Sequence, residues 1–173
     1  LGTDTVRNLV LASALIESVD SVPGIDLKHY WSHVFEVAEL TKLLDKHQGG
    51  RGENAFTCGL MHNIGRLILH KGLPANLVAR ITDLEPLKGR ANAEHAVVGF
   101  NYAELGAELA KQWSFPTFIS DAILWHYHPL KAEPFSREAG LIHLAIELST
   151  LTELNPDQPA PETWPDKVAD KLG

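Results

Sequence analysis

Apolar side chains recur at intervals of three and four residues along most of this chain, and this period constrains the fold more than any other feature. In the segment that begins at Asp26, for example, Val34, Val37 and Leu44 fall on one face of a predicted helix. Strict alternation of apolar and polar residues, which is typical of half-buried strands, does not stand out. The pattern therefore predicts an all-α fold, a multi-helix bundle of about eight helices.

Residues that cap or break helices divide the chain into these elements. Asp26 suits the N-cap of one helix, and Asn101 with Glu104 forms the capping-box pattern of another. The predicted helices cover about 3–19, 26–47, 54–71, a short stretch from Pro74, 91–100, 101–113, 116–129 and 136–151. We expect residues 1–152 to form one helical domain, and residues 153–173 to form a Pro-rich connector with a short C-terminal helix.

Composition limits the classes of partner. The formal net charge is -7 and the pI is about 5.7, which argues against nucleic acid and anionic membranes, because both are bound through basic surfaces. No apolar run approaches the roughly 20 residues that span a bilayer. The single cysteine, Cys58, permits no internal disulfide and suits a reducing cytoplasm, where we expect the protein. The chain starts at Leu1 without a methionine, so we expect a fragment of a longer protein.

Nine histidines raise the question of metal binding. The usual zinc patterns are missing, since the sequence has no H-E-x-x-H motif and no pair of cysteines. His29 and His33 are four residues apart and could meet a metal from one helical face, although His29 falls near the exposed start of its predicted helix. The more unusual feature is "GLMHNIGRLIL", in which the polar pair His62 and Asn63 interrupts an apolar run.

Four stretches of the sequence together resemble one known family. They are "LKHYWSHVFEVAELTKLL", "AFTCGLMHNIGRLIL", "AVVGFNYAELGAELAKQWSFPTFISDAILWHYHP" and "AGLIHLAIELS". Their combination is similar to the HDOD domain, a bacterial relative of the HD-domain metal-dependent phosphohydrolases, over about residues 1–151. The resemblance implies an HD-like helical bundle. It also implies that the chain lacks the opening helices of a complete HDOD domain.

The resemblance also assigns the positions of a metal site. In catalytic HD proteins a histidine, a His-Asp pair and a later aspartate hold the metal. Carried over, these positions fall on His33, on the pair His62 and Asn63, and on Ile146. Both carboxylates are thereby replaced, although a hydrolytic cation needs anionic ligands. We expect a vestigial pocket with no metal, no other cofactor and no catalytic activity, whose polar groups bond to one another, to the backbone or to water.

Two alternatives to this assignment stay open. A register shift of one residue would place the carboxylate of Glu147 where the resemblance puts Ile146. Further histidines could also converge on His33 and His62 as an all-nitrogen site suited to zinc or nickel, and the candidates are His126, His128 and His143. Separately, Arg66 lies one turn after His62 and could contact an anionic ligand, as could His126.

The HDOD resemblance implies a regulatory module of bacterial signal transduction, a pseudoenzyme that acts through protein–protein contacts with other signalling domains or proteins. A homo-oligomer is left open. Two other functions remain as alternatives. One is a divergent HD-type metal-dependent phosphohydrolase or phosphodiesterase, and the other is a domain that senses a nucleotide or another anion.

Overall fold

The computed structural model describes residues 21–153 and 167–173, and these residues form helices joined by short loops. The helices are α2 (Leu27–His47), α3 (Glu53–Met61), α4 (Ile64–Gly72), α5 (Ala75–Lys88), α6 (Arg90–Val98), α7 (Tyr102–Gln112), α8 (Thr117–Trp125), the 3-10 turn η1 (Pro129–Lys131), α9 (Arg137–Glu153) and α10 (Lys167–Leu172). The all-α prediction is confirmed. The helix predicted at 3–19 and the proline-rich part of the connector lie outside the described residues.

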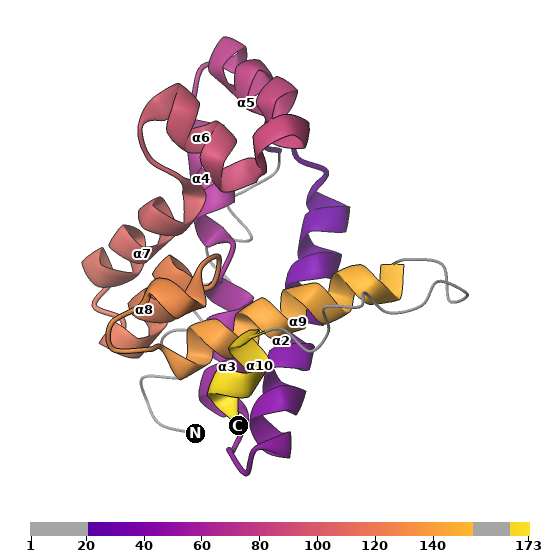
Figure 1. The fold of residues 1–173 in the computed structure, drawn as a ribbon. Coiled ribbons are helices and arrows are strands. Elements are labelled where there is room, and N and C mark those ends of the chain that lie inside the picture. Colours follow the sequence, from indigo (N-terminus) through magenta and orange to yellow (C-terminus); the bar gives the residue numbers. More distant parts are fainter. Residues whose placement is uncertain (1–20, 154–166) are drawn as a thin grey trace.

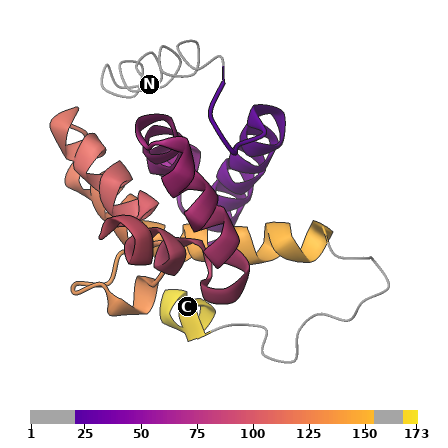
Figure 2. The ribbon, with the colours of Figure 1, turned by 90° about the horizontal axis from the view of Figure 1, so that it is seen from above.

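Two long helices form the frame of the molecule. α9 crosses α2, as both ribbon views show (Figure 1, Figure 2), and α3 packs against both of them. α7 packs against α4 and α8, and α8 in turn contacts α9. α5 and α6 pair with each other at the end of the molecule that lies away from α3 and α10 (Figure 1). This arrangement brings α2, α4, α6 and α9 together around one pocket.

The apolar faces predicted from the periodicity are buried in two main clusters, and a third, small cluster contains Ala91, Tyr102 and Ala103. The larger cluster is formed mainly by α2, α3, α7, α8 and α9, and it includes the fully buried Val34 and Val37. The smaller cluster lies around Leu69 and Ile81, where α4, α5 and α6 meet. Each fully buried aliphatic side chain contributes roughly 1.5–3 kcal/mol, so these clusters are the main source of stability.

The two predicted N-caps are confirmed. The Asp26 carboxylate accepts hydrogen bonds from two backbone amides in the first turn of α2, at 2.9 and 3.1 Å. Asn101 does the same at the start of α7, and Glu104 accepts from the Asn101 backbone amide at 2.8 Å, which completes the capping box. Such a cap is worth about 1 kcal/mol and defines where each helix begins.

The prediction of one continuous helix over residues 54–71 is wrong. The segment forms two helices, α3 and α4, which are separated at His62 and Asn63. Gly59 lets α3 lie against α2, where a Cβ atom would come within 2.7 Å of Ala38 Cα. Gly65 lets α4 lie against the start of α7, where a Cβ atom would overlap backbone atoms. The break between the two glycines lets α3 pack against α2 and α4 pack against α7. It places the polar pair, His62 and Asn63, at the bend between the two helices.

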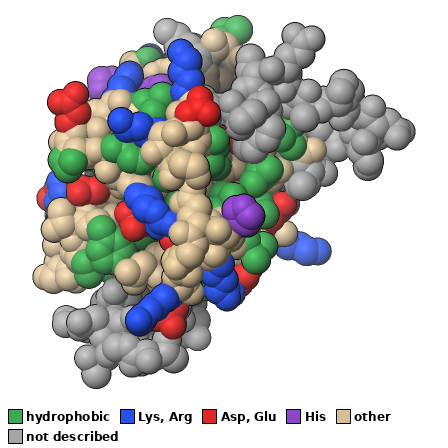
Figure 3. Space-filling model, turned by 60° about the horizontal axis from the view of Figure 1, so that its bottom comes forward, with side chains coloured by type: hydrophobic (Ala, Val, Ile, Leu, Met, Phe, Trp, Pro, Cys, Tyr) green, Lys and Arg blue, Asp and Glu red, His purple; other side chains and the backbone are tan. Residues whose placement is uncertain are grey.

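Side chains of both charges share the visible surface of the molecule. On the face shown in Figure 3, acidic and basic side chains are interspersed with apolar ones rather than gathered by sign. A polyanion would instead require a continuous basic patch. None of the described helices combines the length and the apolar character that crossing a membrane requires.

Candidate functional site

His62 directly follows α3 and is buried, with 2% of its surface exposed. Its Nδ1 atom lies 2.6 Å from the carbonyl oxygen of Gly59, one turn earlier. Because a carbonyl oxygen only accepts hydrogen bonds, Nδ1 donates this one, and the lone pair of the neutral ring lies on Nε2. Burial, followed by the proximity of His126, lowers the pKa of His62 well below its usual range, so the ring is neutral at physiological pH.

The same arrangement recurs at the end of α8. His126 is 1% exposed, and its Nδ1 donates to the carbonyl oxygen of Ile123 at 2.7 Å. Its Nε2 accepts a hydrogen bond from the hydroxyl of Tyr102 at 2.9 Å, so both ring nitrogens are engaged. Burial lowers the pKa of His126 from 6.5 to about 4. His126 is therefore a neutral, fully bonded ring in the core.

His33, His62 and His126 form a row of three imidazoles. The ring centres of His62 and His126 are 5.4 Å apart, and those of His33 and His62 are 6.3 Å apart. The Nδ1 atom of His33, on α2, lies 3.4 Å from the hydroxyl oxygen of the buried Ser149 on α9. The structure thus brings the two predicted histidines together with the candidate His126.

A pocket of about 300 Å³ opens beside this row. It is lined by His29, Tyr30, His33, Asn63, Arg66, Arg90, Ile146 and Thr150. Three of the four predicted vestigial positions, His33, Asn63 and Ile146, therefore face one space, and His62 adjoins His33 in the row. Among the residues that the structure describes, the lining carries two guanidinium groups and two imidazoles and no carboxylate.

We expect the polar groups of the His62 and Asn63 pair to be hydrogen-bonded, and Asn63 meets this expectation only with its backbone carbonyl. Its backbone carbonyl accepts from the hydroxyl of Tyr30 at 2.9 Å and from the backbone amide of Arg66 at 3.0 Å. Its side chain precedes α4 without capping it, and Oδ1 is buried with no hydrogen-bond partner. Because a buried amide oxygen is normally bonded, Oδ1 is the polar atom of this pocket that most needs an explanation.

Two arginines line the pocket from α4 and α6. The Nε atom of Arg66 is buried and has no hydrogen-bond partner, whereas Nε of Arg90 donates to the carboxylate of Glu85 at 3.0 Å. Burial, and then the nearby charge of Arg90, lowers the pKa of Arg66 below its usual value. Arg90 also lies over the ring of Tyr102, with 5.9 Å between its guanidinium carbon and the ring centre.

Glu94 is a buried carboxyl that the sequence analysis missed. It is 0% exposed, its Oε2 accepts from the backbone amide of Tyr102 at 2.7 Å, and its Oε1 has no partner. Burial raises the pKa of Glu94 from 4.5 to about 7, although the Tyr102 amide and the charge of Arg90 act in the opposite direction. The signal that could have revealed it is the spacing of Arg90 and Glu94, one helical turn apart.

The alternative register at the last metal position finds no support. Ile146 lines the pocket, and Glu147, the next residue, is exposed and does not belong to the lining. Successive helical residues point about 100° apart, and here Ile146 borders the pocket while the side chain of Glu147 is directed to the surface. The position that the resemblance assigns to an aspartate therefore presents a hydrocarbon to the pocket.

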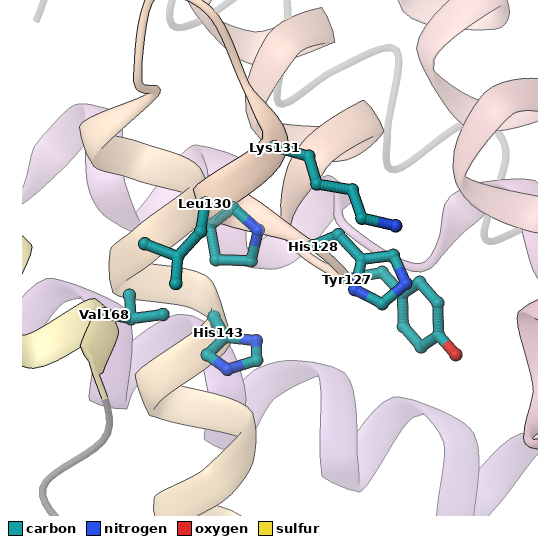
Figure 4. A pocket seen from close by; sticks show the side chains of 7 residues that line it. Tyr127, His128, Leu130, Lys131, His143 and Val168 are labelled. Carbon is teal, nitrogen blue, oxygen red and sulfur yellow. The ribbon is translucent and has the colours of Figure 1, made fainter.

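The remaining candidate histidines do not join the row. His128 and His143 line a separate pocket of about 220 Å³ near η1, together with Tyr127, Lys131 and other residues (Figure 4). The Nδ1 atom of His143 donates to the backbone carbonyl of His126 at 3.1 Å. This ring therefore bonds to the backbone at the end of α8 and not to the three-imidazole row. The proposed convergence on His33 and His62 is thus limited to His126.

The side chains around the row do not fit a hydrolytic divalent cation. In the part of the chain that the structure describes, no group of three or more His, Cys, Asp or Glu side chains is arranged to hold a metal. His126 already uses both ring nitrogens, Asn63 is neutral, and Ile146 has no donor atom. Arg66 would also repel a cation in this pocket.

Comparison with known proteins shows what the chain is similar to. A family model described as the HDOD domain matches residues 1–129. A provisionally assigned phosphohydrolase of Shewanella amazonensis SB2B has a solved structure that is 38% identical, with a TM-score of 0.79 and coverage of 91% of this chain and 58% of that one. An HDOD domain protein of unknown function from Geobacter sulfurreducens is 25% identical, with a TM-score of 0.74 and coverage of 99% and 58%.

Two further relatives extend the comparison. A provisionally assigned signal transduction protein of Marinobacter aquaeolei VT8 is 29% identical, with a TM-score of 0.75 and coverage of 100% of this chain and 40% of that one. An uncharacterized protein of Treponema pallidum (strain Nichols) is 22% identical over 166 residues, which are 92% of this chain and 31% of the relative. The chain therefore spans 58% of the Shewanella and Geobacter proteins, 40% of the Marinobacter protein and 31% of the Treponema protein.

Proposed function

Because the chain belongs to the HDOD domain family, we propose that it is a non-catalytic regulatory module that acts in signal transduction through contacts with other proteins. The observation that carries this proposal is the pocket beside His33, whose described wall residues offer an amide at Asn63 and a hydrocarbon at Ile146 but no carboxylate. A cation that activates water for hydrolysis needs anionic ligands to balance its charge. The buried histidines then serve to hold helix ends rather than a metal.

The names of the similar structures give weight to both the proposal and its main alternative. The Marinobacter relative is named for signal transduction, which agrees with a regulatory module. The Shewanella relative, at 38% identity, is provisionally named a phosphohydrolase, so hydrolysis of a phosphoester is the activity to test against. The described residues of this chain favour the first, because none of the acids among them lines the pocket to compensate for the two missing carboxylates.

Exposed apolar side chains on α2 support a role in protein contacts. Phe35 and Leu43 are 48% and 58% exposed, and their spacing places them in one stripe of the helix. The ring of the half-buried Trp31 extends this stripe, with 6.4 Å between its centre and that of Phe35. Grouped apolar side chains at a surface are typical of interaction sites. The partners that we propose are other signalling domains or a second copy of this chain.

The test of the proposal combines metal analysis with an activity screen. We expect the purified protein to contain far less than one equivalent of transition metal. We also expect no hydrolysis of phosphomonoesters, phosphodiesters or cyclic dinucleotides above the buffer rate with added Mg²⁺, Mn²⁺, Ni²⁺ or Zn²⁺. Saturable turnover that is abolished in a folded His62→Ala variant would contradict the proposal, since contaminating activity would not respond to that change.

A further inference from the structure

The pocket beside His33 has a basic lining that a role in protein contacts does not use. Arg66 and Arg90 reach it from two different helices, and His29 and His33 belong to its wall. No carboxylate lines it within residues 21–153 and 167–173. Arg90 is partly neutralised by Glu85. Arg66 has no ion pair within 4 Å in the described part of the chain, and its Nε is a buried donor without an acceptor.

The pocket also contains an acceptor without a donor. Asn63 is 3% exposed, and its Oδ1 forms no hydrogen bond although Asn63 lines the pocket. Leaving a buried polar atom unsatisfied is energetically costly, and such atoms in native proteins call for a hydrogen-bond partner. Water or a ligand in the pocket would supply that partner. Arg66 and Asn63 both line this pocket, so a small adjustment of either side chain would bring the unpaired donor or the unpaired acceptor to a ligand there.

We infer that this pocket binds a small phosphorylated ligand, a phosphomonoester of the size of a sugar phosphate or mononucleotide. Phosphate oxygens accept hydrogen bonds from guanidinium groups in a paired geometry that suits Arg66 and Arg90. A protonated phosphate oxygen, or a hydroxyl group of the ligand, would donate to Oδ1 of Asn63. The volume of about 300 Å³ lies at the lower limit of small-molecule pockets, which excludes a polymer and favours a compact ligand.

Two carboxylates outside the pocket lining reduce the positive charge that a bound anion would experience. Glu85 and Glu94 attract the two arginines from outside the lining, and they do not cancel the burial of Arg66, whose pKa remains lowered. Arg66 and Arg90 also repel each other. A bound dianion would relieve this repulsion from the pocket side. The site differs from a metal-dependent phosphate site, because the side chains of the chain itself hold the anion.

The test is a titration of the metal-free protein in EDTA at constant ionic strength, so that its outcome is independent of any catalysis. Inorganic phosphate and AMP should each raise the melting temperature in a saturable way that follows mass action, with matching heats in calorimetry. Sulfate, which carries no proton to donate at neutral pH, should bind more weakly than phosphate. Arg66→Gln should weaken AMP binding at least about tenfold.

Two further variants make the test specific. Arg80→Gln removes the same charge from an exposed position on α5 and should leave the affinity unchanged. Ile146→Asp places a carboxylate on the pocket wall and should abolish binding even if Arg66→Gln does not fold. A flat response to phosphate and AMP would overturn the inference. So would equal losses in Arg66→Gln and Arg80→Gln, because binding would then depend on net charge alone.

Discussion

The ends of α3 and α8 are built alike but lead into different surroundings. His62 and His126 both keep helical backbone angles, with φ -53°, ψ -33° and φ -56°, ψ -29°, and the Nδ1 atom of each donates to a carbonyl one turn earlier. At the α8 end, Tyr102 satisfies the second ring nitrogen. At the α3 end, the next residue is Asn63, whose Oδ1 has no partner.

This difference distinguishes a buried histidine that only stabilises a helix end from one that adjoins a candidate ligand pocket. In both places the ring ends a helix by satisfying a backbone carbonyl, so burial and neutrality alone do not indicate a metal or a catalytic base. What distinguishes the α3 end is the set of unsatisfied polar atoms beside it, on Asn63 and Arg66. Those atoms, rather than the histidines, point to a ligand.

The largest expected effect is on stability, at the α8 end, where both ring nitrogens of His126 are hydrogen-bonded. His126→Ala should lower the free energy of unfolding by about 3 kcal/mol, because it removes two buried hydrogen bonds and leaves a cavity. His62→Ala should cost about 2 kcal/mol, since water from the neighbouring pocket can occupy part of the space. Urea unfolding followed by circular dichroism measures both. The exposed His128→Ala is the matched control, and equal losses at His62 and His126 would remove the distinction between the two ends.

The next effect concerns pH, because His126 and Glu94 titrate with opposite consequences. The folded pKa of His126 is about 4, below its ordinary 6.5, so its contribution to stability is complete above pH 6.5 and is lost as the pH falls toward 4. The folded pKa of Glu94 is about 7, above its ordinary 4.5, so its contribution is complete below pH 4.5 and is lost as the pH rises through 7. Between pH 5 and 7 the two contributions oppose each other.

Glu94→Gln should therefore expose the acid sensitivity of the histidines. From pH 8 to pH 5 the free energy of unfolding of this variant should fall by about 2 kcal/mol for His126, with His62 acting in the same direction. The unchanged protein should lose clearly less over the same interval. Urea unfolding at several pH values provides the comparison. Parallel curves for the two proteins would show that Glu94 does not retain its proton in the folded state.

A smaller effect distinguishes the two tyrosines that support the two ends. Tyr102→Phe leaves Nε2 of His126 buried without a donor, and we expect a loss of about 1–2 kcal/mol. Tyr30→Phe removes a donor from the Asn63 carbonyl, which keeps its bond from the Arg66 backbone amide, so we expect only about 0.5–1 kcal/mol. The same unfolding assay ranks them. The reverse order would mean that the α3 end carries the greater stability.

The smallest expected effect is on metal affinity. Asn63→Asp alone should raise the affinity for Mn²⁺ or Zn²⁺ only a few-fold, because Ile146 still offers no ligand and Arg66 still repels a cation. Combined with Ile146→Asp, the gain should be much larger. Calorimetric titration of the two variants measures this difference. Tight binding by Asn63→Asp alone would show that the second acidic position lies elsewhere than at residue 146.

Some parts of this site could be predicted from the sequence because they depend on local patterns. The polar pair in an apolar run marked His62 and Asn63, and the capping-box spacing located the start of α7. Glu94 escaped notice because the stretch around it is small and polar, without a clear apolar period. Its burial depends on how α6 packs against α7, and a long-range contact of that kind leaves little trace in a local pattern.

The sequence by itself determined the all-α class and the starts of α2 and α7, since apolar spacing and helix caps are local properties. Only the tertiary structure decided that the predicted third helix breaks at His62, that Tyr102 satisfies His126, and that Arg66 and Arg90 line one pocket with Asn63. The physical reason is that hydrogen-bond satisfaction and burial depend on which helices meet, and packing of the whole chain decides that.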